Sequence, residues 1–388
     1  MTDVVVAGIG QIPVGDHYSL SLRSMGVQAL VKALHDRGDL KPDALYIGNL
    51  LGSTLSHQAN LGALFTDYAR LDHIEAYTTE AAGASGAAAL RVAYLAIQSG
   101  YADTVAVLGV EKWSDVTREE ADALLSQELD FDYEAIPGLN SAGEAALLMQ
   151  RYLHEYNLPG DALAGFPIQA HTNAVTNPNA LFRKPLTAET YASAPMLSDP
   201  LNIYDGAAYA DGAAALILTR RELLPKNFPH PIVRLLGSSV SVDTLAWHDR
   251  RDPLAFTAAK TAVESAALQA GIMPVYTDLF ELDDSFSIYA ALTLEACGFA
   301  EKGSAWQMAR DGLLAPGAKL PAMTMGGCKA RGNPIGAKGV YQAVEAVQQL
   351  RGVAGPNQVK NARIALTLAL GGPASTAIAH VFDRVETR

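Results

Sequence analysis

Polar residues in the second half of the sequence suit proton transfer beside a carbonyl group. Asp283 and Asp284 are adjacent carboxylates in FELDDSF, within an otherwise apolar stretch. If they are buried together, one of them holds a raised pKa suited to taking up protons near neutral pH. Asn333, in GNPIGAKG, carries an amide donor that is able to stabilise an enolate oxygen.

The two aspartates also have an ordinary structural interpretation. One of them caps the helix expected over SFSIYAALTLEA, and the other accepts a hydrogen bond from a backbone N–H group. The sequence favours neither interpretation over the other.

A glycine-rich turn, EAAGASGAAAL (Glu80 to Leu90), opens a stretch of good helix formers. Such a turn exposes the first backbone N–H groups of a helix, whose positive end favours an oxyanion or an activated nucleophile. We therefore expect the amides of Gly83, and of Gly371 and Gly372 in LALGGPAS, to contribute to an anion site. The alternative is a connection that only lets strand and helix pack closely.

The two cysteines indicate neither a disulfide framework nor a metal site, which fits a reducing compartment. Cys297, in TLEACGF, follows a helical apolar pattern and is expected in the core. Cys328 lies beside Lys329 and near Arg331, whose charges favour a thiolate. An isolated cysteine in a packed glycine turn is nevertheless more often inert.

The elements that must position these residues repeat along the chain. GASGAAALRVAYLAIQSGYADTVAVLGVEK shows a glycine turn, a helix pattern and an apolar strand, and GNPIGAKGVYQAVEAVQQLRG followed by NARIALTLALGG shows the same order. We predict two related α/β halves, residues 1–222 and 223–388, with the glycine turns facing each other across the junction.

A less regular segment, at about residues 115–200, is predicted to be a loop domain inserted into the first half. Its part from Asp115 to Glu134 carries eight acidic residues and one basic residue, Arg118, and is expected to form a solvated face. Arg183 and Lys184, in FRKPLT, are candidates for binding the phosphates of a small ligand.

Composition restricts the classes of partner. The formal net charge is −12, which argues against a nucleic-acid backbone as ligand. No apolar run reaches membrane-spanning length, and MTDVVVAGIG reads as a first strand without signal-peptide features. A cytoplasmic protein that binds neither nucleic acid nor membrane is expected.

Six stretches resemble the thiolase superfamily, and particularly its sterol-carrier-protein type, in the order that those proteins show. They are EAAGASGAAAL with the following GVEK, HTNAVTNPNA, PLNIYDGAAYADGAAALIL, FELDDSF, GGCKARGNPIGAKG and LALGGPAS. The resemblance implies a thiolase fold, with two pseudo-repeated α/β halves in a layered α-β-α-β-α arrangement.

The resemblance also implies which catalytic side chains are replaced. Gly83 stands where thiolases carry the nucleophilic cysteine, and Asp283 where they usually show His or Asn. Asn333 replaces the His of Gly-His-Pro, and Leu370 lies where classical members have their acid–base cysteine. An acyl-cysteine mechanism therefore lacks its reacting groups.

The activity implied is the cleavage of a 3-hydroxyacyl-CoA, as in cysteine-free aldolases of this group, with Asp283 or Asp284 as base and Asn333, Gly83 and Gly372 around the enolate. A catalytically silent subunit that binds acyl-CoA is the alternative, and thiolase activity is third. The resemblance implies a coenzyme A thioester as substrate, no permanent cofactor and no metal. It also implies a homodimer, formed through an edge strand near Thr104 to Leu108 or its surroundings, and a small OB-fold, zinc-ribbon partner.

Overall fold

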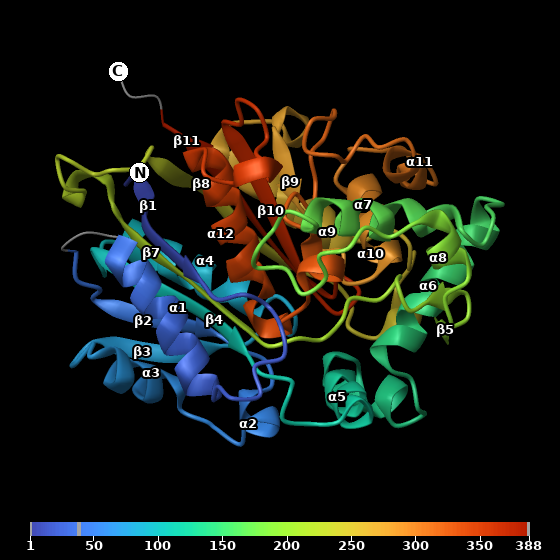
Figure 1. Ribbon diagram of the computed structural model, residues 1–388, viewed down its shortest axis with the longest axis horizontal. Helices are drawn as coiled ribbons and strands as arrows, with labels where there is room; N and C mark the ends of the chain where they lie inside the picture. Colours follow the sequence, from blue (N-terminus) through green and yellow to red (C-terminus); the bar gives the residue numbers. More distant parts are fainter. Residues whose placement is uncertain (1, 37–39, 386–388) are drawn as a thin grey trace.

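Two α/β halves share one mixed sheet in the computed structural model, which describes residues 2–36 and 40–385 (Figure 1). Within these residues the sheet has nine strands in the order β3-β2-β4-β7-β1-β8-β11-β10-β9. The strands are β1 (Val4–Gln11), β2 (Ala44–Gly48), β3 (Glu75–Thr79), β4 (Thr104–Glu111), β7 (Gly212–Arg220), β8 (Val233–Val242), β9 (Leu279–Glu281), β10 (Ile364–Gly371) and β11 (Thr376–Arg384). A separate short ribbon pairs β5 (Met196–Ser198) with β6 (Leu201–Asn202).

The helices alternate with these strands. They are α1 (Leu22–Asp36), α2 (Gly52–Leu55), α3 (Leu61–Ala69), α4 (Ser85–Gln98), α5 (Arg118–Leu125), α6 (Ser141–Glu155), α7 (Gly165–Ala174), α8 (Ala188–Ala192), α9 (Thr257–Ala270), α10 (Ser287–Ala296), α11 (Ala305–Arg310) and α12 (Lys338–Arg351). Apolar positions recur along α4, α9 and α12, as helices that cover a sheet require.

The order of strands repeats between the halves. Parallel β2 and β4 are followed across the sheet by antiparallel β7 and β1, and parallel β9 and β10 by antiparallel β11 and β8. Three clusters of buried apolar side chains form the core. In the first, α1 and α3 pack on the strands of the first half. The second surrounds α4 and α12, and in the third α9 and α10 pack on the strands of the second half. The predicted α/β fold with two similar halves is therefore confirmed, with the strands of both halves in one mixed sheet, whereas the boundary at residues 222 and 223 stays a prediction.

The two middle helices, α4 and α12, approach each other closely because small residues face one another. A Cβ atom at Gly86 would lie 2.8 Å from the carbonyl oxygen of Gly336, and one at Gly339 would lie 2.5 Å from the amide of Ala87. Glycine at these two positions therefore allows the backbones to touch, and this contact brings the amino-terminal ends of both helices to the centre of the molecule.

The inserted segment is largely helical and carries α5, α6, α7 and α8. Four of the eight residues in its acidic run are exposed, as predicted: Asp115, Glu119, Glu120 and Asp132. The prediction is wrong for Glu134, which is buried and accepts a hydrogen bond from the Trp247 amide at 2.6 Å. Glu128 is also not fully solvated: it is half-buried between the buried Leu125 and Leu129, and its carboxylate accepts a hydrogen bond from the Gly83 amide.

The edge of the sheet is not where the sequence placed it. The stretch from Thr104 to Leu108 lies in β4, which pairs with β2 on one side and with β7 on the other. The expected free edge there is wrong. The first half instead ends at β3, which pairs only with β2 within the described residues and exposes Tyr77.

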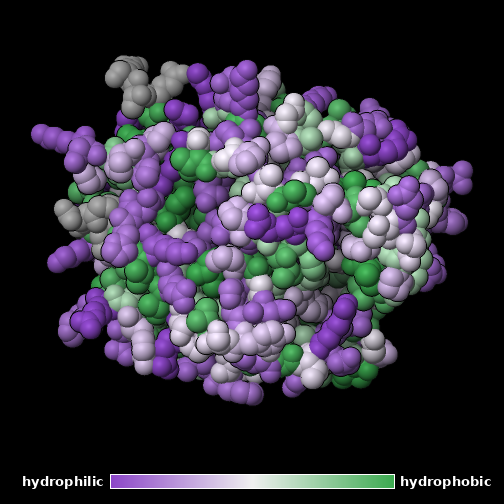
Figure 2. Space-filling model, in the orientation of Figure 1, coloured by the Kyte–Doolittle hydropathy of each residue, from purple (hydrophilic) through white to green (hydrophobic). Residues whose placement is uncertain are grey.

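Hydrophilic and hydrophobic side chains are interspersed on the face shown in Figure 2. Among the described residues, no helix combines the length and the apolar character that crossing a bilayer requires.

A buried histidine at the junction of the halves makes folding stability depend on pH. His380, on β11, places its ring nitrogens 3.1 Å from Ser238 Oγ and 3.2 Å from the carbonyl oxygen of Ala87. Burial lowers the pKa of His380 to about 3. Because the folded-state pKa lies below the unfolded value, this contribution to stability is complete above about pH 6.5 and is lost as the pH falls below it.

We therefore expect the free energy of unfolding to fall by about 2 kcal/mol between pH 6.5 and pH 5 from this group. Urea denaturation of the wild type and of His380→Gln at both pH values measures it. An equally steep loss in the variant would assign the effect to other groups.

Candidate active site

The turn before α4 is fixed by hydrogen bonds and presents a backbone amide to a carboxyl group. Ser85 anchors the turn, because its hydroxyl donates to the carbonyl of Ala82 at 2.6 Å and accepts from the amide of Ala81 at 3.0 Å. The amide of Gly83 then donates to Glu128 Oε1 at 2.6 Å. The Gly83 amide is therefore already engaged by a carboxyl group of the protein itself.

Glu128 ends a short helical turn, Ser126–Glu128, that follows α5. The buried side chains of Leu125 and Leu129 fix this turn on both sides. Burial raises the pKa of Glu128 to about 7, although the Lys338 ammonium and the amides of Gly83 and Gly372 favour its charged form. Its carboxylate is therefore poised to titrate near neutral pH.

Asp283 forms a buried ion pair with Lys338, at 2.6 Å between Oδ2 and Nζ. It also accepts hydrogen bonds from the hydroxyl and amide of Ser285 and from the amide of Leu370, at 2.6, 3.0 and 2.9 Å. Burial acts to raise its pKa, but Lys338 and these hydrogen bonds hold the pKa of Asp283 below its ordinary value. Both oxygens are thus engaged, and the carboxylate stays ionised.

Asp284 holds the neighbouring turn, Gly327–Arg331. Its Oδ1 accepts from the Cys328 amide at 2.6 Å, and its Oδ2 lies 3.4 Å from the Lys329 amide. Gly327 has a φ of 56°, and a Cβ atom there would collide with the Asp284 carboxylate. Burial raises the pKa of Asp284. The two adjacent aspartates therefore point to different partners.

Asn333 follows this turn and lies at the centre of the molecule, 3% exposed. Its backbone N–H donates to the carbonyl of Ala208 at 2.9 Å, and its side chain lines a small cavity. Its Oδ1 atom is buried and has no hydrogen-bond partner among the described residues.

Residues of both halves and of the insertion line this cavity. They are Leu125, Glu128, Ser141, Glu144, Ala207, Tyr209, Ser285, Phe286, Tyr289, Asn333, Ile335, Lys338 and Gly372. The structure thus brings Asn333, Gly372 and the Lys338 partner of Asp283 to one place, with Gly83 joined to it through Glu128. Asp284 is not part of the lining.

A larger cleft of about 420 Å³ adjoins the small cavity and shares Ala207, Tyr209 and Phe286 with it. Tyr209 stacks on Trp113 at 4.7 Å between ring centroids. The predicted phosphate ligands Arg183 and Lys184 are exposed and do not line this cleft, but the preceding residue, Phe182, does.

Neither cysteine offers an accessible thiol. Cys328 is fully buried and Cys297 is 7% exposed, and burial raises the pKa of both thiols. The hypothesis that Cys328 acts as a nucleophile therefore finds no support in its surroundings. Its contribution is the backbone amide that binds Asp284.

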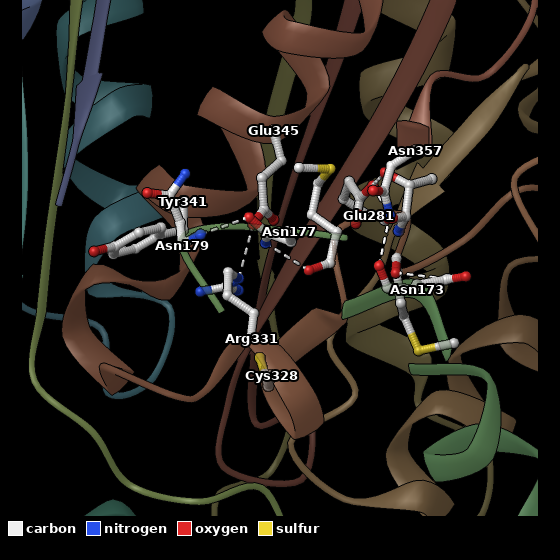
Figure 3. Close-up of polar contacts among 12 residues, drawn as sticks. Asn173, Asn177, Asn179, Glu281, Cys328, Arg331, Tyr341, Glu345 and Asn357 are labelled. Carbon is white, nitrogen blue, oxygen red and sulfur yellow. Dashed lines mark hydrogen bonds and ion pairs between the residues drawn. The ribbon is translucent and has the colours of Figure 1, made fainter. Parts of the chain in front are cut away.

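A buried polar network supports the segment that leads to Asn333 (Figure 3). Arg331 pairs with Glu345 at 2.9 Å, and its guanidinium lies 4.9 Å from the centroid of the Tyr341 ring. The Tyr341 hydroxyl donates to the carbonyl of Ile12 at 2.8 Å and accepts from the Ala213 amide at 2.9 Å. Tyr341 therefore ties α12 to the first half.

Amide side chains hold the other end of the same segment. Asn177 donates to the carbonyl of Met325 at 2.8 Å, and Asn173 to that of Met323 at 2.9 Å (Figure 3). Asn357 donates to the carbonyl of Thr324 at 2.7 Å. These bonds satisfy buried carbonyl groups and fix the backbone before the turn Gly327–Arg331.

Three charged residues of the cavity, Glu128, Glu144 and Lys338, were not predicted. Glu128 was missed because its acidic neighbours indicate a solvated surface, and Glu144 because it is a single acidic residue after that run. Leucines that flank Glu128 were the available signal. Lys338 is the first residue of α12, where a positive charge opposes the helix dipole, and this unusual position indicates a buried anionic partner.

A layered α/β fold whose two middle helices point their amino-terminal ends at one polar cavity is characteristic of thiolase-like proteins. The thiolase amino-terminal domain matches residues 4–222, and the thiolase carboxyl-terminal domain-like family matches residues 239–384. The chain belongs to the thiolase family, whose substrates are coenzyme A thioesters and which keeps no permanent cofactor.

Relatives cover nearly the whole chain. An acetyl-CoA acetyltransferase of Methanothermobacter thermautotrophicus is 37% identical over 99% of this chain and 100% of its own length. The benzoylsuccinyl-CoA thiolase subunit BbsB of Thauera aromatica is 27% identical over 95% of this chain and 94% of its own length.

Solved structures share the fold. The Ltp2-ChsH2(DUF35) aldolase gives a TM-score of 0.84 at 21% identity and covers 98% of both chains. The Acat5 thiolase from Ascaris suum in complex with coenzyme A gives a TM-score of 0.73 at 18% identity, over 99% of this chain and 100% of the other.

Proposed function

We propose that this protein cleaves or forms a carbon–carbon bond beside a coenzyme A thioester without an acyl-enzyme intermediate. The observation that carries the proposal is the environment of Gly83. A Cβ atom there would lie 2.6 Å from Lys338 Nζ and 2.7 Å from the carbonyl oxygen of Leu370. The position of a nucleophilic side chain is therefore filled by other groups.

The residues around the cavity suit a retro-aldol reaction. A carboxylate takes the proton of the substrate's 3-hydroxyl group as the Cα–Cβ bond breaks. The former hydroxyl carbon becomes a carbonyl, and the bonding electrons pass to the thioester as an enolate. Protonation of the enolate at Cα gives the shortened acyl-CoA. The side-chain amide of Asn333 is the donor proposed for the enolate oxygen.

The other predicted site residues take supporting places in this proposal. Asp283 keeps Lys338 charged inside the cavity, and Asp284 fixes the turn before Asn333. The amides of Gly83 and Gly372 bind a carboxylate rather than the substrate. Arg183 and Lys184 are proposed to meet coenzyme A phosphates outside the cleft that Phe182 lines.

Partners are proposed from the edge of the sheet and from the relatives. The unpaired side of β3 is a suitable place for a second copy of the chain, because an uncovered edge invites pairing. The relative named as a thiolase subunit, and the neighbour named as an aldolase with a DUF35 protein, favour a small OB-fold, zinc-ribbon partner.

Acyl transfer is the second candidate, because a relative at 37% identity is named an acetyl-CoA acetyltransferase.

The test is to incubate the protein, alone and with the products of neighbouring genes, with 3-hydroxyacyl-CoA or with 3-ketoacyl-CoA plus free CoA. The proposal expects an aldehyde or ketone from the first substrate. Thiolysis of the second would favour acyl transfer, and inactivity toward both would favour a silent binding subunit.

Substitution of Gly83 by Cys tests whether a thiol alone restores thiolase chemistry. We expect no robust thiolysis and a loss of about 1–3 kcal/mol in the free energy of unfolding, since the new side chain displaces Lys338 and presses on Leu370. Thiolysis kinetics and urea denaturation measure the two effects. Fast thiolysis by Gly83→Cys would show that a thiol was all that was missing.

A further inference from the structure

We infer that Glu128 is the catalytic base of this site and that its carboxylate stands in the place that a nucleophilic side chain at position 83 would need. The inference rests on the proposed function, whose base it identifies. It moves the proton-transfer role away from Asp283 and Asp284, to a residue that the inserted segment supplies.

Geometry supports this placement. A Cβ atom at Gly83 would lie 3.1 Å from Glu128 Oε1, and the Gly83 amide donates to the same oxygen at 2.6 Å. The carboxylate therefore lies directly at the head of α4. Because position 83 has no side chain, the Glu128 carboxylate has room to approach the backbone there.

The neighbours of Glu128 favour a base that is ionised and able to accept a proton. Charged and titratable groups face it from several elements: Lys338 at the start of α12, Asp283 after β9, Glu144 on α6, Tyr289 on α10, and Tyr209 before β7. Lys338 and two backbone amides stabilise its charge, whereas burial and Asp283 oppose it. These opposing effects suit general base catalysis near neutral pH.

Glu144 lines the same cavity but is a poorer base. It is fully buried, and neither of its carboxylate oxygens has a hydrogen-bond partner among the described residues. Burial, with the charge of Glu134, raises the pKa of Glu144 to about 8. Without a hydrogen-bond donor from the described residues on its carboxylate, Glu144 favours the neutral form. Asp283 is excluded for the opposite reason, because its oxygens are occupied by Lys338, Ser285 and Leu370.

The step balances with the groups present. Glu128 accepts the proton of the 3-hydroxyl group while the Cα–Cβ bond breaks and the carbonyl product forms. The protonated Glu128 then returns a proton to Cα of the enolate, which gives the acyl-CoA and restores the carboxylate. No oxidant, reductant or further reactant is required.

Substitutions of Glu128 test the inference. Glu128→Gln is expected to lower kcat about 10²–10⁴-fold with a small change in KM, because it removes the base and keeps the shape. In the wild type, kcat/KM should rise with pH through about pH 7 as Glu128 ionises, and the variant should lose this rise. Asp132→Asn, on an exposed residue of the same segment, is the control and should retain wild-type kinetics.

Chemical rescue separates a base from a structural carboxylate. Glu128→Ala should be inactive, and added formate should restore turnover in proportion to its concentration. If the wild type is a lyase and Glu128→Gln keeps the same activity and pH profile, the inference about Glu128 is wrong, although the proposed function stands. A wild type that releases no carbonyl product would overturn the proposed function and the inference with it.

Discussion

Asn333→Ala is expected to lower kcat/KM for 3-hydroxyacyl-CoA cleavage by about a hundredfold or more, with acyl-CoA binding nearly unchanged. The variant removes one hydrogen-bond donor from the place where negative charge develops, which has this order of effect in other oxyanion sites. Steady-state kinetics, together with the affinity for a non-cleavable acyl-CoA, separate the two quantities.

Asn333→His tests the same claim by rescue. A histidine restores a ring N–H donor at this position, so part of the activity should return. Equal activity of the wild type, Asn333→Ala and Asn333→His would remove Asn333 from the reaction. Loss of binding rather than of turnover in Asn333→Ala would make it a substrate-binding residue instead.

Lys338→Met is expected to lower the free energy of unfolding by about 3–5 kcal/mol and to abolish turnover. Lys338 is 3% exposed and lies 2.6 Å from Asp283, which is fully buried. Removal of one partner leaves the other charge buried without compensation, which is strongly destabilising. Urea denaturation measures the loss.

Two further variants separate this pair from general effects of lysine removal. Lys260→Met breaks an exposed ion pair with Glu264 and is expected to change stability by less than about 1 kcal/mol. The double variant Lys338→Met with Asp283→Asn should recover part of the lost stability, since no uncompensated charge remains. A similar loss in both lysine variants would contradict the role of the buried pair.

The architecture was predictable because the sequence repeats its pattern. The glycine turns before Ser85 and before Lys338 each precede a helix of apolar periodicity and a strand, and the structure packs those two helices together. The edge near Thr104 was predicted wrongly, because an apolar strand such as β4 has the same pattern whether one or both of its sides are paired.

The site was predictable in part. Asn333 and Gly372 line one cavity, and Gly83 and Asp283 contact Glu128 and Lys338 in its wall. The difference between Asp283 and Asp284 was not predictable, because adjacent side chains in an extended segment point in opposite directions and meet different partners. Glu128 was missed because its position depends on Leu125, which packs against residues far away in sequence such as Leu51 and Ile335.

The most direct test of the central claim is to let the protein act on a 3-hydroxyacyl-CoA in D₂O and to measure the masses of the product and of the intact protein by mass spectrometry. A carbon–carbon lyase without an acyl-enzyme should release an aldehyde or ketone together with an acyl-CoA that carries one solvent deuterium at Cα. The mass of the intact protein should stay unchanged throughout the reaction. An acyl adduct on the protein, or an acyl-CoA formed only from 3-ketoacyl-CoA and free CoA, would contradict it.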